Sequence, residues 1–139
     1  DSKMKNTNIT IKLDIQEKKV LAYENELIQV LLVLLNNAKD VLETLDSSKV
    51  FYITSYFDEE FLYIETLDNG GGVSDSIVMK IFDPYFTTKH QSKGTGVGLY
   101  IANQIIMNHM HGELSVKNKT FSYENQEYTG AQFTIKIPL

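Results

Sequence analysis

The 139-residue sequence has no cysteine and no long apolar run. The missing cysteine excludes disulfides, zinc sites built on thiolates and cysteine nucleophiles, and it is compatible with a cytoplasmic setting. The longest apolar run, residues 30–35, is far shorter than the roughly 20 residues of a membrane-spanning helix, and the first residues lack the layout of a signal peptide. We therefore expect a cytoplasmic domain without direct membrane contact. Because the sequence starts at Asp1 and not at Met, we expect a longer parent protein, which leaves room for a membrane anchor.

Positive charge is also scarce. The net charge of -5 argues against a nucleic-acid partner, because a phosphate backbone is generally neutralised by clustered Lys and Arg. One local exception holds Lys80, Lys89, His90 and Lys93 around the single acid Asp83. Such a cluster is commonly a solvated loop, and it gains interest only because glycines follow it.

The composition is that of one folded domain. With 42% hydrophobic and 22% charged residues, the chain is neither disordered nor fibrous. A chain of this length buries roughly two-thirds of its unfolded surface around a single core. We therefore expect residues 1–139 to form one domain.

Hydrophobic periodicity predicts the order of the elements. Alternation predicts strands at residues 8–13 and 19–22, which we expect to pair as a hairpin, and a second hairpin at residues 50–57 and 61–67. Apolar spacing by threes and fours predicts long helices over residues 24–45 and 96–110, and residues 76–82 form a short helix candidate. A last pair of strands, 113–118 and 132–137, is joined by a polar loop at 119–130. This order predicts an α+β two-layer sandwich, with a mixed, mostly antiparallel sheet covered on one face by helices.

The first candidate site lies on the long helix that starts near residue 24. Val33, Asn37 and Asp40 share one face at spacings of four and three residues. An Asn beside an apolar stripe is often no more than a cap on a backbone group. Its carbonyl oxygen is also a suitable ligand for Mg²⁺, which prefers oxygen donors and usually keeps substrate phosphates among its ligands.

The second candidate site is Asp68 and the glycines that follow it. Asn-Gly after a strand is ordinarily a tight turn, but Gly70, Gly71 and Gly72 exceed what a turn requires. An Asp at a strand end above bare backbone can accept a hydrogen bond from an exocyclic amine such as that of adenine. Val73 and Ile81 would then supply apolar walls.

The third candidate site is the glycine-rich start of the second long helix. Glycines at such a junction expose unpaired N–H groups at the positive end of the helix dipole, where phosphates bind. The spacing is neither a Rossmann fingerprint nor a Walker loop, so this motif alone is weak. Its residues are Gly94, Thr95, Gly96, Gly98 and Leu99.

Taken in order, the motifs resemble those of the GHKL superfamily, named for gyrase, a heat-shock chaperone, histidine kinases and MutL, and most closely its histidine-kinase branch. ELIQVLLVLLNNAKDV (residues 26–41) resembles the N box and DNGGGV (68–73) the first glycine box. FDPYFTTK (82–89) resembles the F box and GTGVGLYIA (94–102) the second glycine box. The resemblance spans nearly the whole chain, and it implies the Bergerat ATP-binding fold.

The resemblance also implies roles for single residues. Asn37 would ligate the Mg²⁺ that bridges the ATP phosphates, and Asp68 would accept a hydrogen bond from the adenine amine. Thr134 would help to position the adenine through water, and Lys89 would meet phosphate charge. The remaining residues would shape the base pocket or the phosphate-binding lid: Asp40, Gly70, Gly72, Val73, Gly94, Thr95, Gly96, Gly98 and Leu99.

One position departs from the family pattern. The N box usually carries a second polar residue four positions before the Mg²⁺ ligand, and this chain has Val33 there. Valine can neither bind a metal nor act as general base for water, so an isolated ATP-hydrolysing machine is disfavoured. A damaged kinase site and a degenerate nucleotide-sensing or docking module both stay open.

The phosphate acceptor is expected outside this chain. His90 lies in the lid, while His109 and His111 end the second helix, so none fits a phosphoacceptor on a dimerising helix pair. The resemblance therefore implies a protein-histidine kinase domain with no catalytic residue of its own, unable to autophosphorylate alone. Its expected partners are ATP or ADP with Mg²⁺, its own dimerisation domain and the receiver domain of a response regulator. An anti-sigma-type serine kinase of the same superfamily is the alternative enzyme.

Overall fold

The computed structural model describes residues 9–15, 24–84 and 98–139. Its strands are β1 (Ile9–Ile15), β2 (Lys49–Phe57), β3 (Phe61–Asp68), β4 (Glu113–Tyr123) and β5 (Gln126–Pro138). Its helices are α2 (Glu24–Leu42), α3 (Asp75–Val78) and α4 (Gly98–Gln104), and α4 continues as the π-helical segment η2 (Ile105–His109). No helix among these residues is long and apolar enough to cross a bilayer.

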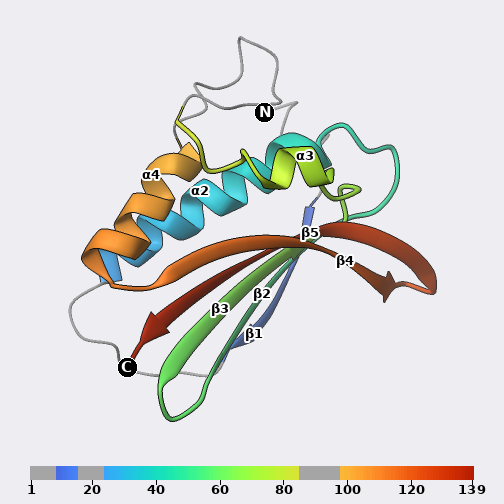
Figure 1. The fold of residues 1–139 in the computed structure, drawn as a ribbon. Helices are drawn as coiled ribbons and strands as arrows, with labels where there is room; N and C mark the ends of the chain where they lie inside the picture. Colours follow the sequence, from blue (N-terminus) through green and yellow to red (C-terminus); the bar gives the residue numbers. More distant parts are fainter. Residues whose placement is uncertain (1–8, 16–23, 85–97) are drawn as a thin grey trace.

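The five strands form one sheet in the order β1-β2-β3-β5-β4. β1 and β2 are parallel, whereas the other neighbours are antiparallel. Helices α2 and α4 lie side by side across one face of this sheet (Figure 1). The prediction of an α+β two-layer sandwich with a mixed, mostly antiparallel sheet is confirmed.

The core lies between the helices and the sheet. α2 buries Val30, Leu34, Ala38 and Leu42, one residue every turn, as its apolar spacing predicts. On the sheet, alternate residues of β3 and β5 face this stripe, among them Ile64 and the residues that bracket Thr134 on β5. Each large apolar side chain buried here stabilises the fold by roughly 1.5–3 kcal/mol.

The structure gives β1 a partner that the predicted first hairpin did not include. β1 pairs in parallel with β2, with Ile9 opposite Lys49 and Leu13 opposite Ile53. The alternation of apolar residues identifies a strand but does not select its partner. A parallel neighbour becomes available because α2 carries the chain from one strand to the other across the sheet. The predicted strand at residues 19–22 lies outside the described residues.

The predicted polar loop at residues 119–130 is also wrong. β4 and β5 continue through this region as one long hairpin that turns at Glu124 and Asn125. Both residues have positive φ, 50° and 62°, as the central residues of a type I′ turn do. The segment is polar because most of its side chains are exposed, which conceals the strand pattern.

This long hairpin bends over the face of the sheet that the helices leave open. Tyr52 of β2 makes edge-to-face contacts with Phe121 and Tyr123 of β4, at centroid distances of 5.8 and 6.4 Å. Two strands separate β2 from β4 in the sheet order, so only a strongly curved hairpin can bring these rings together. Figure 1 shows this curvature at the β4–β5 end.

The shorter helices differ from their predicted extents. α3 is a single turn, and residues 79–84 continue as turns where the prediction had helix to residue 82. α4 begins at Gly98 and changes to π-helix at Ile105. An α-helix therefore covers only the first part of the predicted helix over 96–110, and a π-helix continues it. Residues 96 and 97 lie outside the described residues.

Candidate functional site

Asp68 ends β3 on the helix-covered side of the sheet, and it is almost fully buried. Its Oδ1 accepts hydrogen bonds from the backbone N–H groups of Gly70, at 2.8 Å, and Ala131, at 3.3 Å. Burial raises the pKa of the Asp68 carboxyl, and the two N–H groups oppose that rise. Because both bonds end on Oδ1, neither of them occupies Oδ2, which can accept a hydrogen bond from a ligand.

The glycines after Asp68 are required by the shape of their loop. Gly71 and Gly72 have φ angles of 98° and 80°, which L side chains rarely adopt. Gly70 packs its bare Cα against Cγ1 of Val41 on α2, so that a side chain there would overlap the helix. The loop therefore approaches the end of α2 as backbone alone.

Gly130 is a further glycine of this site that the sequence analysis missed. A Cβ on Gly130 would overlap the backbone carbonyl oxygen of Asp68. β5 can therefore approach the end of β3 closely enough for the Ala131 N–H to reach the carboxylate only because residue 130 has no side chain. In the sequence this glycine ends a polar stretch, and only the spatial neighbour reveals its role.

Asn69 anchors the other side of the loop. Its Oδ1 accepts from the N–H of Val50 at 3.0 Å, and its Nδ2 donates to the carbonyl of Ser48 at 2.8 Å. Asn69 is buried, so both partners replace water that the amide would otherwise bind. Asn-Gly after a strand predicts an ordinary turn, but the side chain of Asn69 fixes the loop to the start of β2.

A row of α2 residues connects this loop with the start of α4. Val33, Asn37 and Val41 follow one another at intervals of four, so they lie about 6 Å apart along one side of the helix. Cγ1 of Val33 lies 3.4 Å from the position of a Cβ on Gly98, and Val41 contacts Gly70 at the other end of the row. Asn37 therefore lies between the Asp68 loop and the first residue of α4. Asp40, partly buried, lies one turn further on the same flank.

The start of α4 offers N–H groups to an anion. Gly98 is the first residue of the helix, and Leu99 packs against the core. The first N–H groups of a helix have no intrahelical partner and lie at the positive end of its dipole. Other predicted phosphate-binding residues, Lys89, Gly94, Thr95 and Gly96, lie outside the described residues.

Val73 and Ile81 lie against the core, whereas Thr134 faces the other side of the sheet. Val73 and Ile81 both belong to the core beneath the loop. On β5, Thr134 lies opposite Glu65, while its neighbour Phe133 faces the core. Alternation along the strands places Asp68 on the core face and Thr134 on the open face of the sheet, so Thr134 cannot line a site beside Asp68. The face on which Thr134 lies depends on the pairing register, which a single sequence does not reveal.

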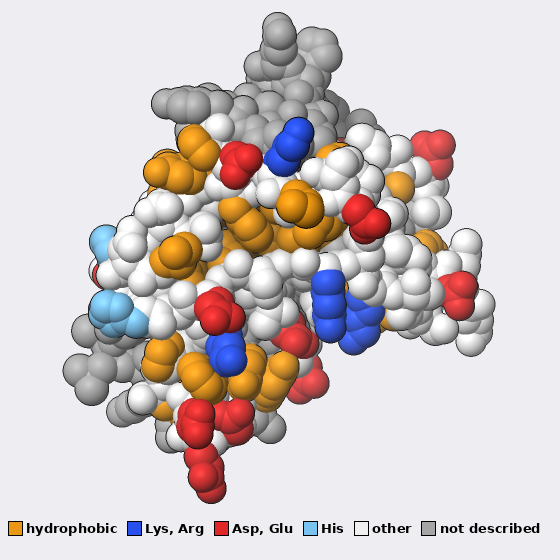
Figure 2. All heavy atoms as spheres, viewed as in Figure 1, with side chains coloured by type: hydrophobic (Ala, Val, Ile, Leu, Met, Phe, Trp, Pro, Cys, Tyr) orange, Lys and Arg blue, Asp and Glu red, His pale blue; other side chains and the backbone are white. Residues whose placement is uncertain are grey.

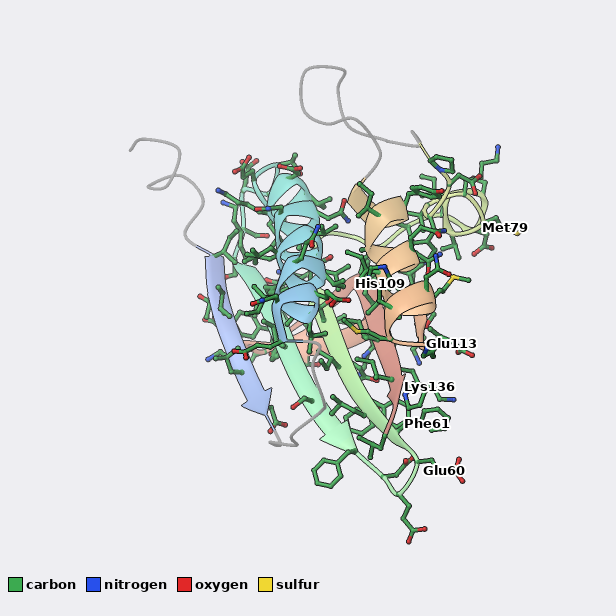
Figure 3. All side chains as sticks on the ribbon, turned by 90° about the vertical axis from the view of Figure 1, so that its left-hand side faces the viewer. Glu60, Phe61, Met79, His109, Glu113 and Lys136 are labelled. Carbon is green, nitrogen blue, oxygen red and sulfur yellow. The ribbon has the colours of Figure 1, made fainter. Side chains whose placement is uncertain are left out.

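The two histidines that the structure describes lie away from this site. Nδ1 of His109 on η2 lies 2.9 Å from Oε2 of Glu26 on α2, and Figure 3 shows His109 between the two helices. His111 has a φ of 57° in the tight connection to β4. His90 lies outside the described residues. Within the described part of the chain, no cluster of His, Asp and Glu could hold a metal ion, so a cation here would need Asn37 and oxygens of a ligand.

Comparison with known proteins identifies relatives of the chain. The family model described as histidine kinase-, DNA gyrase B- and HSP90-like ATPase matches residues 22–139. The two-component sensor PprA of Pseudomonas aeruginosa is 33% identical over 128 residues, which are 89% of this chain and 13% of the relative. Sporulation kinase E of Bacillus subtilis is 29% identical over 135 residues, which are 96% of this chain and 17% of the relative. The chain thus spans less than a fifth of either protein.

Solved structures agree with these relatives. The catalytic domain of histidine kinase ThkA has a TM-score of 0.73 to this chain at 27% identity, covering 99% of this chain and 84% of that one. ThkA in complex with the response regulator protein TrrA is matched at 26% identity with a TM-score of 0.69, covering 99% of this chain and 36% of that one. On the family match, the relatives and the shared fold, this chain belongs to the histidine kinase-, DNA gyrase B- and HSP90-like ATPase family.

Proposed function

We propose that this chain is the catalytic ATP-binding domain of a sensor histidine kinase that acts in the cytoplasm. The observation that carries the proposal is the position of Asn37, between the Asp68 loop and the first residue of α4. One α2 row thus connects the Asp68 loop, where the base would lie, with the start of α4, where the phosphates would lie. The similarity to PprA, sporulation kinase E and ThkA selects the histidine-kinase branch of the family.

The residues fit an adenine nucleotide. Oδ2 of Asp68 would accept a hydrogen bond from the exocyclic amine, and the bare backbone at Gly70 and Gly72 leaves room for a flat ring. Val73 would pack against the ring. The phosphates would extend along α2 toward the N–H groups of Gly98 and Leu99, with the glycines and Lys89 of the adjoining segment as further ligands. Asp40 would lie beside the same path.

Mg²⁺ fits this arrangement with a reduced ligand set. The amide oxygen of Asn37 is a hard donor of the kind that Mg²⁺ accepts, and the phosphates would complete most of its coordination. When bound, the ion neutralises charge on the phosphates as the γ-phosphoryl group leaves. Val33, one turn earlier, cannot add a second amide. The metal should therefore be held more weakly than in a site with two amide ligands.

The protein supplies alignment and not acid–base chemistry. The nucleotide would be held so that a histidine of a neighbouring dimerisation domain attacks the γ-phosphate, after which the receiver domain of a response regulator takes the phosphoryl group. His109 is engaged by Glu26 across the α2–η2 contact, away from the site. With Val33 in the second N-box position, no side chain there can activate water, which protects the nucleotide from hydrolysis.

Calorimetric titration of the domain with ADP or a non-hydrolysable ATP analogue, with and without Mg²⁺, tests the proposal. We expect binding that Asp68→Asn abolishes and that Mg²⁺ strengthens. A domain that binds neither nucleotide would leave the docking module as the better explanation. An anti-sigma-type serine kinase would bind nucleotide equally well, and it would be recognised by phosphoryl transfer to a serine of a partner protein.

Val33 motivates the degenerate-module alternative, and Val33→Asn tests it in a chain completed by the dimerisation domain. If the site is an impaired kinase site, the substitution should raise autophosphorylation about tenfold, because a second amide ligand is restored. A completed protein that stays inactive with Asn at this position, while still binding ADP, would identify a nucleotide-sensing module.

A further inference from the structure

Asn118 of β4 holds one residue of the glycine loop, Val73, by both of its backbone polar groups. Its Oδ1 accepts from the N–H of Val73 at 2.7 Å, and its Nδ2 donates to the carbonyl of the same residue at 2.6 Å. The side-chain amide therefore makes the two-way pairing that a neighbouring strand would make. This pairing holds the loop two residues before α3 begins at Asp75.

The loop is shaped to receive this amide. A Cβ on Gly72 would lie 2.5 Å from Oδ1 of Asn118, so the amide can approach Val73 only because residue 72 is glycine. One residue earlier, the N–H of Gly71 donates to the carbonyl of Thr129 at 2.8 Å. The β4–β5 hairpin thus contacts three consecutive residues of the loop, and it holds two of them, Gly71 and Val73, by hydrogen bonds.

The hairpin that carries Asn118 is itself fixed. Two residues further along β4, Thr120 pairs with Thr129 across the hairpin, with 3.0 Å between their hydroxyl oxygens. The rings of Phe121 and Tyr123 then contact Tyr52 on the open face of the sheet. Asn118 is exposed and lies beyond the part of β4 that reaches the core, so its side chain has no evident packing role.

We infer that Asn118 is a positioning residue for the adenine base. By fixing the backbone N–H and carbonyl of Val73, it sets the distance between the Val73 side chain and the carboxylate of Asp68, which is anchored separately through Gly70 and Ala131. The two fixed edges define a slot for one flat ring with an amine at one end. This inference rests on the proposed nucleotide-binding function.

The test compares Asn118→Ala with the wild-type chain, and Asn108→Ala is the matched control. Asn108 is also exposed, and its amide donates one hydrogen bond, to Gln104, but it lies on η2. We expect Asn118→Ala to bind ADP about five- to tenfold more weakly, to narrow the preference for ADP over GDP, and to accelerate hydrogen exchange of the Val73 N–H. The control should match the wild type in all three measurements.

Asn118→Asp adds a second, directional test. Aspartate can still accept from the Val73 N–H, but it cannot donate and would place a carboxylate oxygen against the Val73 carbonyl. We expect ADP affinity no better than in Asn118→Ala, with unfolding temperatures of both variants within a few degrees of the wild type.

The outcomes separate this inference from the proposed function. Equal ADP affinity and an unchanged ADP to GDP ratio in Asn118→Ala would overturn the inference while leaving nucleotide binding intact. Weaker ADP binding with an unchanged ratio and a matching loss of thermal stability would overturn it as well, because the role would then be structural only. A wild-type chain that binds no ADP would instead remove the proposed function.

Discussion

The carbonyl oxygen of Asp68 occupies the space in which a side chain on Gly130 would begin. This contact brings β5 against the end of β3, where the Ala131 N–H donates to the Asp68 carboxylate. Gly130 has a backbone conformation open to any residue, so the requirement for glycine here is one of space. At Gly71 a side chain would meet open space, and glycine is required instead by the backbone φ of 98°.

The two glycines should therefore fail in different ways when replaced by alanine. Gly130→Ala forces β5 away from β3, and we expect the free energy of unfolding to fall by about 3 kcal/mol or more. Gly71→Ala incurs only backbone strain, which costs about 1 kcal/mol. Chemical denaturation of both variants measures the difference. Equal losses would show that the strands do not meet as closely as described.

Asp68→Asn should separate binding from stability. Asn can keep its Oδ1 on the Gly70 and Ala131 N–H groups, which places its Nδ2 donor where an adenine amine would also donate. We therefore expect ADP affinity to fall by about a factor of 100 or more, as an unpaired buried donor costs roughly 1–3 kcal/mol on each side. Calorimetric titration measures the loss. An Asn variant that binds like the wild type would show that this carboxylate does not contact the base.

The pH dependence of stability should differ in sign between Asp68 and Asp58. Burial raises the pKa of Asp68, so its contribution to stability is present at low pH and is lost as the pH rises through its folded-state pKa. Asp68→Asn should thus be at least as stable as the wild type at pH 7, with the difference vanishing below about pH 4, the ordinary Asp range.

Asp58 is the internal control for this experiment. The N–H groups of Phe61 and Glu60 donate to its carboxylate and lower its pKa, so its contribution is present at neutral pH and is lost on acidification. Asp58→Asn should therefore reduce stability at pH 7. Thermal unfolding of both variants between pH 3 and 8 checks the signs, and two losses of the same sign would contradict the assignment.

Asn37→Ala should remove the Mg²⁺ effect and leave metal-free binding nearly unchanged. Asn37 is the amide of the Val33–Asn37–Val41 row, and with valines one turn to either side no neighbour in the row can replace its oxygen. We expect wild-type ADP affinity to rise about tenfold with Mg²⁺ and the variant to show no such rise. Titrations with and without Mg²⁺ measure both. Asn36→Ala, on the exposed side of the same helix, is the matched control.

Tyr56, on the open face of the sheet, should make stability depend on pH in the alkaline range. Burial and the 2.8 Å hydrogen bond to Glu65 raise the pKa of Tyr56 to about 12. Because the raised pKa favours the neutral phenol, its contribution to stability is complete below pH 10 and is lost as the pH rises toward 12. Tyr56→Phe should cost about 0.5 kcal/mol at pH 8, a small value because the bond is largely exposed, and less at pH 11. Denaturation at the two pH values compares them.

Charged side chains surround Tyr56 near the β2–β3 turn. Acidic side chains gather at the lower end of Figure 2, where Figure 1 places the β2–β3 turn. Nζ of Lys136 lies 4.2 Å from the ring centroid of Phe61, and Figure 3 shows the two side by side. Tyr56 stacks on Tyr63, which donates to Asp58. Salt should therefore weaken the Tyr56 effect only slightly, since its main partner is in direct contact.

Local signals in the sequence were sufficient for the long helix α2 and for one hairpin. α2 and the β2–β3 hairpin follow from spacing and turn residues within about twenty positions, and both predictions are confirmed. The same periodicity placed Asn37 on a helix and Asp68 at a strand end, where the structure has them. Their roles toward a nucleotide stay predictions until binding is measured.

Features that depend on distant pairing could not be predicted. The parallel partner of β1, the curved β4–β5 hairpin and the open-face position of Thr134 all follow from strand register, which a single sequence does not reveal. Gly130 and Asn118 escaped notice for the same reason. Each is ordinary in its own segment and becomes significant only against Asp68 or Val73.

The bond between the Asp68 carboxylate and the Ala131 N–H joins positions 63 residues apart, which sets the order in which the site can appear during translation. A ribosome adding about 5–20 residues per second produces Asn37, Asp68 and the glycine loop several seconds before β5 exists. In that interval the carboxylate has no partner from β5 and the loop no support from the hairpin. ATP is therefore not expected to stabilise the nascent chain during folding. It should bind only after β5 has taken its place in the sheet.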